Sequence, residues 1–412
     1  MATCEMGRKC FRRVTLLLAG LLSFPVQAAP LSVTLGVLTD MNGFVADATG
    51  RGSVVAAELA AETFKAEDSE ASVRVISADH QNKADVGSAI ARNWIDREGV
   101  SAILDVPFSS VALAVNEVTR GTGAAFLASG PGAVALTGER CSPNTVHWTY
   151  DTWALANGTA RALTQAGGDT WFFITADYAF GQSLEADATK VVLAMGGKVL
   201  GDARHPPSGS DFSSYLVAAQ ASGAKIVGLA NAVTDTSNSI KQAAEFGLTA
   251  GGKQRLAALL LQVTDVNALG LAVAQGLYLT DAFYWDMNDG TRAFSDRFSA
   301  RMGGARPTSF QAGVYSSALA YLRAARAVGS TDARKVLPEM RRAPITDALF
   351  GTVQVRPDGR AVHTMFLFQV KTPAESKGPW DFYKLLATIP ADQAFRRFSD
   401  GGCRLGGPLD GH

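Results

Sequence analysis

The chain alternates short apolar runs with longer segments in which apolar residues recur every three or four positions. The first pattern predicts buried strands and the second predicts amphipathic helices. The strands predicted in the first part of the chain are residues 31–40, 73–79, 100–106 and 124–129, and helical patterns lie between them. Strands that are apolar almost throughout and alternate with helices are typical of a parallel sheet covered on both faces.

The same alternation starts again near residue 150. A helical pattern leads into strands predicted at residues 170–177, 198–205, 225–231 and 256–262. Two successive units of roughly a hundred residues each predict an α/β protein with two Rossmann-like lobes.

The last third of the chain differs from the first two. It contains a predicted strand at 276–285, helices near 290–303 and 309–328, and a hairpin whose turn is the sequence "RPDGR" at 356–360. These elements are too few for a third core, so we expect them to complete the two lobes.

The N-terminal stretch has the layout of a secretory signal peptide, with four basic residues, an apolar run at 14–24 and small residues before the expected cut after Ala28. The apolar run is too short to span a bilayer. The predicted division of the chain is a signal peptide at 1–28, a first lobe from 29–147 plus 280–347, a second lobe from 148–279 plus 348–395, and a tail at 396–412 that returns to the first lobe. The chain is expected to cross between the lobes near 146–150, 276–280 and 345–352, and these crossings would form a three-strand hinge.

Charge and cysteine content agree with an exported protein. Without residues 1–28 the chain has 34 basic and 37 acidic residues, so nothing in its charge favours nucleic acid or an anionic membrane as a partner. Cys4 and Cys10 leave with the signal peptide, and neither follows the apolar run where a lipid-anchoring cysteine would have to lie. Cys141 and Cys403 remain, and an even pair in an oxidising compartment predicts a disulfide. Two unrelated free thiols are the alternative.

The sequence carries none of the common catalytic signatures. It has no G-x-S-x-G, H-E-x-x-H, P-loop or C-x-x-C motif. Its five histidines are scattered without metal-ligand spacing. A glycine-rich stretch at 121–126 precedes a strand instead of following one, which excludes a dinucleotide turn. We therefore expect neither an enzyme nor a bound metal or cofactor.

The informative segments are the turns that follow the predicted strands, because ligands of open parallel sheets bind at the carboxyl ends of the strands. These turns are rich in aromatic and small polar residues, they contain no lysine, and Arg51 is their only arginine. They predict a small ligand whose negative group is met by backbone amides and hydroxyls. The turns are residues 40–52, 105–110, 128–133, 176–181 and 230–235.

Two of these turns suggest how a carboxylate would be held. Ser109 and Ser110 begin a predicted helix, whose first amides point outward and carry partial positive charge. The alternative is that one serine simply caps the helix. In "ASGPGA", Gly130 and Gly132 allow the backbone to approach a ligand while Pro131 fixes the bend, although a plain loop is equally compatible.

Taken together, the signal peptide, the two lobes and the serines after the third strand resemble the type I periplasmic binding proteins, in particular the leucine/isoleucine/valine-binding protein family of ABC importers. The resemblance covers essentially the whole mature chain. It is carried by the stretches at 31–52, 176–188, 225–247 and 276–286 and by the terminal hairpin.

The resemblance implies a role for individual residues. A carboxylate would be bound by Ser109 with its neighbours Phe108 and Ser110 and by the backbone of Gly130, Pro131 and Gly132. The resemblance implies that Tyr178 or Phe180 closes over the ligand, and that the contact to its ammonium group comes from the loop of Asn231 and Asp235. It also implies an aromatic contact on the hinge side from Tyr284 or Trp285 and a contact from the first loop through Ala48 or Thr49. The residues themselves leave other roles open, because each aromatic side chain fits a core position and Asp235 fits a helix cap.

The resemblance also implies a monomer in the periplasm that delivers a small solute to a membrane permease, and it supports the pairing of Cys141 with Cys403. Gly132 departs from amino-acid binders, which have a hydroxyl residue close to this position. Amino acids and aromatic carboxylates therefore both remain candidate ligands. The alternative functions are an exported sensor domain that signals to a membrane receptor and a hydrolase acting in the cleft between the lobes.

Overall fold

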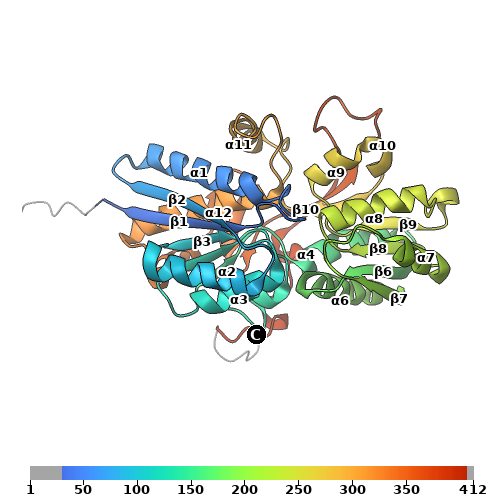
Figure 1. The fold of residues 1–412 in the computed structure, drawn as a ribbon, viewed down its shortest axis with the longest axis horizontal. Coiled ribbons are helices and arrows are strands. Elements are labelled where there is room, and N and C mark those ends of the chain that lie inside the picture. The colour runs from blue at the N-terminus through green and yellow to red at the C-terminus, as the bar shows by residue number, and fades with distance from the viewer. Residues whose placement is uncertain (1–29, 406–412) are drawn as a thin grey trace, which may run out of the picture.

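The computed structural model describes residues 30–405. The predicted signal peptide at 1–28 therefore lies outside the described residues, as do residues 406–412. Two groups of strands and helices lie side by side along the long axis of the molecule (Figure 1). No helix among residues 30–405 combines the length and the apolar character needed to cross a membrane.

The first lobe is built on a five-stranded parallel sheet with the strand order β2-β1-β3-β4-β5. Residues of β1 and β3 alternate between two cores, because successive side chains of a strand point to opposite faces. Leu35 and Leu104 face the core under α1 and α12, whereas Leu38 and Ile103 face the core under α2 and α3. The strands are β1 (Ser32–Thr39), β2 (Ser72–Asp79), β3 (Ala102–Asp105), β4 (Ala125–Ala128) and β5 (Thr145–His147). The helices are α1 (Gly50–Glu67), α2 (Ala84–Asn93), η1 (Trp94–Glu98), α3 (Ser109–Thr119), η2 (Val134–Thr137), α11 (Asp289–Ser299), α12 (Ser309–Val328) and α13 (Ala333–Arg342).

The second lobe repeats this arrangement on a four-stranded parallel sheet with the order β7-β6-β8-β9. Phe173 of β6 packs in the core that contains Leu184 of α6, and Ile174 packs on the opposite face with Leu216 of α7 and Ile240 of α8. The strands are β6 (Thr170–Ala176), β7 (Lys198–His205), β8 (Ile226–Ala230) and β9 (Arg255–Ala258). The helices are α4 (Thr152–Leu155), η3 (Ala156–Ala160), α5 (Arg161–Gln165), α6 (Ala179–Ala194), α7 (Ser213–Ser222), α8 (Thr234–Glu245), η4 (Ala250–Gly252), α9 (Val263–Leu269) and α10 (Leu271–Ala274).

The C-terminal elements form two small antiparallel sheets. One sheet has the order β10-β14-β15 and contacts η3 of the second lobe. The other has the order β11-β12-β13, and its turn at 356–360 is the predicted hairpin turn. The strands are β10 (Tyr278–Asp281), β11 (Ile345–Asp347), β12 (Gly351–Val355), β13 (Ala361–Val362), β14 (Met365–Val370) and β15 (Tyr383–Ile389), followed by α14 (Ala391–Ala394) and η5 (Phe398–Asp400).

The strand pairing corrects one predicted lobe boundary. Residues 348–395 were expected to belong together to the second lobe. Instead, β12 pairs with β11, and Arg360 bridges to His147 at the end of β5, so the first sheet continues into residues 345–362. The third crossing therefore follows Val362 and does not lie near 345–352. The other boundaries stay predictions.

The structure contains the predicted disulfide between Cys141 and Cys403, which are 262 positions apart in the sequence. The segment before Cys403 also contacts the first lobe, because the Arg396 guanidinium donates a hydrogen bond to the carbonyl of Val134 at 3.3 Å. The end of the described chain is thereby held against the loop after β4.

Candidate ligand-binding site

Turns that leave the two parallel sheets meet between the lobes. Phe108, which follows β3, stacks on Tyr178, which follows β6, with ring centroids 4.4 Å apart and planes 2° apart. The Thr234 hydroxyl at the start of α8 donates a 2.8 Å hydrogen bond to the carbonyl of Phe44 in the β1–α1 turn. The carboxyl ends of both sheets therefore face one another, which is the geometry expected for a ligand site in this class of fold.

The backbone is strained in two of these turns. Asp105 and Val106 have φ values of 74° and 57°, and Val233 at the start of α8 has a φ of 47°. L-residues rarely adopt such values, and β-branched valine does so with particular difficulty. Strain of this kind is found mainly at functional sites, where the surrounding structure holds a turn in one required shape. The turns after β3 and β8 are therefore the first candidates for ligand contact.

The predicted carboxylate site lies at the start of α3. Ser109 is the first residue of the helix and is buried, and its hydroxyl oxygen accepts hydrogen bonds from the backbone amides of Gly132 and Ala133, both at 3.3 Å. The N-cap residue is Phe108, which has no acceptor to satisfy the first amides. The alternative that a serine caps this helix is therefore wrong. Ser110, one position on, is partly exposed.

The loop after β4 is a fixed structure whose glycines are required by crowding. A Cβ on Gly132 would lie 2.8 Å from the rings of both Phe180 and Tyr150, and a Cβ on Gly130 would lie 2.6 Å from the Asp105 carboxylate. The Tyr150 hydroxyl donates a 2.7 Å hydrogen bond to the carbonyl of Gly130. The carbonyl of the intervening Pro131 lies 2.7 Å from Nε2 of His147. Tyr150 was missed by the sequence analysis, since it follows the short strand β5 and looks like an ordinary core aromatic.

Several carboxyl groups are buried in the two lobes, and that of Asp105 lies beside Gly130 of this loop. Burial raises the pKa of Asp105 to about 6. One of its carboxylate oxygens accepts a 2.8 Å hydrogen bond from Thr39, and the other has no hydrogen-bond partner in the part of the chain that the structure describes. Burial raises the pKa of Asp281, at the end of β10, to about 7, although the Ala282 amide donates to it at 2.8 Å. Burial likewise raises the pKa of Asp265 in α9 to about 7. A neutral carboxyl group is a hydrogen-bond donor, so near neutral pH these groups are able to contact either a carboxylate or an amine.

A further pair of polar residues joins the lobes near Asp281. The backbone amide and the hydroxyl of Ser309, at the start of α12, donate to the side-chain carbonyl of Gln262 at 3.3 and 3.2 Å. The side-chain amide nitrogen of Gln262 is buried and has no hydrogen-bond partner among residues 30–405. Sequence reasoning missed both residues, because Gln262 ends an apolar run and Ser309 begins a helix that reads as core.

The side chains of Asn231 and Asp235 are engaged within the second lobe. Asn231 binds Ser239 and His205, and Asp235 accepts hydrogen bonds from the amides of Ser208 and Gly209 at 3.0 and 2.9 Å. Burial raises the pKa of Asp235 to about 6. The helix cap considered for Asp235 is wrong, because α8 begins at Thr234 and Asp235 lies inside its first turn.

The remaining candidates hold neighbouring segments in place. The Tyr284 hydroxyl and the Trp285 indole both donate to the carbonyl of Trp380, at 2.7 and 2.8 Å. The carbonyl of Ala48 accepts from Thr308 at 2.7 Å, and that of Thr49 accepts from Gln311 at 3.1 Å, so the start of α1 is tied to the start of α12. The structure thus brings together Phe108, Ser109, Gly130, Pro131, Gly132, Tyr178 and Phe180. Ligand contact by any predicted site residue stays a prediction.

Comparison with known families agrees with this architecture. The family model described as periplasmic binding protein matches residues 32–379. The chain is a periplasmic binding protein. The family consists of solute-binding proteins, and the described residues contain no group of three histidine, cysteine, aspartate or glutamate residues placed to hold a metal ion.

Several solved structures are similar to this periplasmic binding protein over most of its length. A periplasmic binding protein from Burkholderia mallei is 47% identical, covers 91% of this chain and 99% of its own, and superposes with a TM-score of 0.88. A branched-chain amino acid ABC transporter periplasmic ligand-binding protein from Burkholderia xenovorans is 39% identical, with coverages of 90% and 99% and a TM-score of 0.80. A solute-binding protein from Rhodopseudomonas palustris in complex with benzoate shares the fold at 20% identity, with coverages of 91% and 100% and a TM-score of 0.78. No curated protein matches the chain.

Proposed function

We propose that this periplasmic binding protein is the solute-binding component of an ABC importer and that it captures a small carboxylate between its lobes. The observation that carries the proposal is the meeting of Phe108 and Ser109 from the first lobe with Tyr178 and Phe180 from the second. This group offers hydroxyls, backbone amides and aromatic faces. A carboxylate fits the uncapped start of α3, where the helix dipole and free amides favour an anion.

The proposed mechanism is lobe closure. Open and closed forms are in equilibrium, and a ligand that contacts both lobes stabilises the closed one. The stack of Phe108 on Tyr178 and the hydrogen bond from Thr234 to Phe44 support a closure in which these turns meet. The closed form would then be recognised by the membrane permease, with the binding protein acting as a monomer in the periplasm.

An aromatic carboxylate is the ligand class that the site favours. Phe44 packs edge-on against Phe108 at 6.0 Å, and Tyr178 lies 6.1 Å from Phe180, so aromatic faces line both sides of the junction. A planar ring of the ligand would take the place that one of these rings now occupies. The benzoate-bound relative and others bound to 4-hydroxybenzoate support this choice.

An amino acid is the second candidate, and a different observation favours it. Asp105 and Asp281 are buried acids near the junction, and neither forms an ion pair with a lysine or arginine of residues 30–405. The ammonium group of an amino acid would supply the missing positive charge. The relative from Burkholderia xenovorans, named for branched-chain amino acids, agrees with this alternative.

A thermal-shift screen followed by calorimetry separates the two classes. The arms are benzoate, 4-hydroxybenzoate, leucine and phenylalanine. A ligand present at about 100 times its dissociation constant stabilises the protein by about 2.7 kcal/mol, which gives a clear shift. Stabilisation by the benzoates alone supports the main proposal, and stabilisation by the amino acids alone supports the second. If no carboxylate shifts the transition, the proposed function is wrong.

A further inference from the structure

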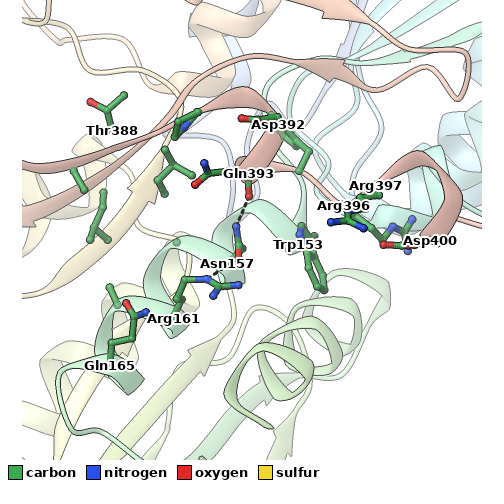
Figure 2. Close-up of a pocket in the computed structure, with 17 residues that line it drawn as sticks. Trp153, Asn157, Arg161, Gln165, Thr388, Asp392, Gln393, Arg396, Arg397 and Asp400 are labelled. Carbon is green, nitrogen blue, oxygen red and sulfur yellow. Dashed lines mark hydrogen bonds between the residues drawn. The ribbon is translucent and has the colours of Figure 1, made fainter. Parts of the chain in front are cut away.

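A cavity of about 600 Å³ lies at the hinge, outside the group of residues that joins the lobes. It is formed between the segment that enters the second lobe, α4–η3–α5, and the segment at 387–400 that returns to the first lobe (Figure 2). This volume is within the usual range of about 300 to 1,000 Å³ for pockets that hold small molecules. No residue predicted for the lobe junction lines this cavity.

One arginine is held in a fixed orientation at this cavity. Asn157 is 7% exposed, and its side-chain oxygen accepts a 3.0 Å hydrogen bond from Nε of Arg161. Its amide nitrogen donates to the carbonyl of Gln393 at 2.6 Å, so Asn157 ties the entering segment to the returning one. Arg161 is exposed and forms no ion pair with an acid among residues 30–405, and its Nη1 lies 3.3 Å from the sulfur of Met195. A buried asparagine thus positions a guanidinium group whose charge no described carboxylate neutralises.

The local backbone supports a functional reading of Asn157. It lies in the five-residue π-helical turn η3, between α4 and α5. Such turns are rare and occur frequently at functional sites. A Cβ on Gly158 would lie 2.1 Å from the Thr280 hydroxyl, so this turn packs closely on β10. One side of the turn therefore packs on β10, while Asn157 faces the cavity (Figure 2).

The rest of the cavity combines apolar walls with charge. Trp153, Leu367, Ile389 and Phe395 supply apolar surface. Arg396 and Arg397 lie on the far side of Trp153 from Asn157 (Figure 2). Asp392 and Asp400 also line the cavity, so its three arginines leave it with a net positive charge. An apolar wall beside an oriented guanidinium group fits a molecule with a carboxylate at one end and an apolar body.

We propose that this cavity is a second binding site, specific for a small organic carboxylate, with Arg161 as the carboxylate contact and Trp153 beside the apolar body. One wall, α4–η3–α5, directly follows the first crossing, and the other, residues 387–400, leads back to the first lobe, so an occupant would contact both segments. It would therefore shift the balance between open and closed forms by its different affinity for each. This site does not depend on the ligand of the lobe junction.

The test uses benzoate as the probe and ¹⁹F NMR of protein labelled with 5-fluorotryptophan. The chain has six tryptophans, and the Trp153 resonance is assigned with Trp153→Phe. Titration with benzoate up to roughly 10 mM should shift this resonance and saturate. Arg161→Gln should lower the affinity for benzoate that this titration measures about tenfold or more, because it removes a charged hydrogen-bonding partner. Arg92→Gln, on the exposed face of α2, is the matched control and should titrate like the unchanged protein.

The other five resonances report on folding and on movement of the lobes. They should coincide in Arg161→Gln and the unchanged protein, which shows that the variant is folded. A Trp153 resonance that does not move with benzoate overturns the proposal. A shift that persists unchanged in Arg161→Gln also overturns it, because it then reports lobe movement caused by binding elsewhere. The thermal-shift screen tests the lobe junction separately when it is repeated with Arg161→Gln, because this variant lacks the charged contact of the second site. Failure of one site then does not imply failure of the other.

Discussion

Phe108 and Tyr178 stack face to face across the junction of the two lobes, with ring centroids 4.4 Å apart. Aromatic pairs contribute about 0.5–1.5 kcal/mol beyond the burial of their area. Tyr178→Ala should therefore shift the ligand-free protein toward the open form by up to about tenfold, whereas Tyr178→Phe should not. Distances between a dye on each lobe, measured by single-molecule fluorescence transfer, provide the check. Identical distance distributions for the alanine and phenylalanine variants would show that the stack does not hold the lobes together.

The two adjacent serines should separate stability from binding. The Ser109 hydroxyl accepts from two buried amides, so Ser109→Ala should lower the free energy of unfolding by about 1–3 kcal/mol. Ser110 is partly exposed, and Ser110→Ala should change stability by less than about 0.5 kcal/mol while weakening carboxylate binding about tenfold. Urea unfolding and calorimetry on the same preparations measure both quantities. Unchanged affinity in Ser110→Ala would remove this serine from the site.

Gly132 should be intolerant of any side chain. The Cβ of Gly132→Ala would lie 2.8 Å from the rings of Tyr150 and Phe180, and relieving that clash should cost about 1–3 kcal/mol. Since Phe180 belongs to the second lobe, Gly132→Ala should disfavour closure of the lobes and lower the affinity for the ligand. Gly123→Ala is the matched control, because its Cβ would meet nothing nearer than 3.9 Å. Equal behaviour of the two glycine variants would contradict the clash as the cause.

The disulfide should stabilise the whole first lobe. Cys141 and Cys403 close a loop of 262 residues, and the chain-entropy model gives about 5.6 kcal/mol for a loop of this length. The double variant Cys141→Ser with Cys403→Ser should therefore unfold at markedly lower urea concentration. Addition of reductant to the unchanged protein should reproduce the effect, and it should leave the double variant unaffected. Equal midpoints for all samples would show that the bridge does not contribute.

The sequence was sufficient for the fold and for the loops that form the junction. Apolar runs predicted the parallel strands to within about four residues, because a strand buried on both faces has few polar positions, with the exception of β5, which was expected only as a crossing between the lobes. The rule that ligands bind beyond the carboxyl ends of strands then selected Ser109, Gly132 and Tyr178, which the structure places in one group.

The residues at the back of the junction were not predictable in this way. The run at 276–285 reads as one strand, but β10 ends at Asp281, and Tyr284 and Trp285 then turn toward the carbonyl of Trp380. The third crossing was misplaced for a related reason. The local pattern of apolar residues predicts where a strand lies but not which strand it pairs with. Arg360 pairs with His147, which is distant from it in the sequence, and the local pattern does not predict this pairing.

Asp281 should make the protein less stable as the pH rises. Burial raises its pKa from 3.8 to about 7, so between these values the folded protein holds a proton that the unfolded chain has released. The contribution of Asp281 to the free energy of unfolding should then fall with pH across this window, by at most about 1.4 kcal/mol per pH unit. Buried His80 and His363, whose pKa burial lowers to about 4, act in the opposite direction, so the comparison with Asp281→Asn isolates the contribution of this carboxyl group. Asp281→Asn should remove this contribution to the pH dependence of the free energy of unfolding. It should not remove the whole dependence, because buried Asp105 and Asp265 act in the same direction as Asp281. Urea unfolding from about pH 4 to 7 provides the measurement, and exposed Asp96→Asn is the control. Parallel curves for Asp281→Asn and the unchanged protein would mean that this carboxyl group does not govern the response.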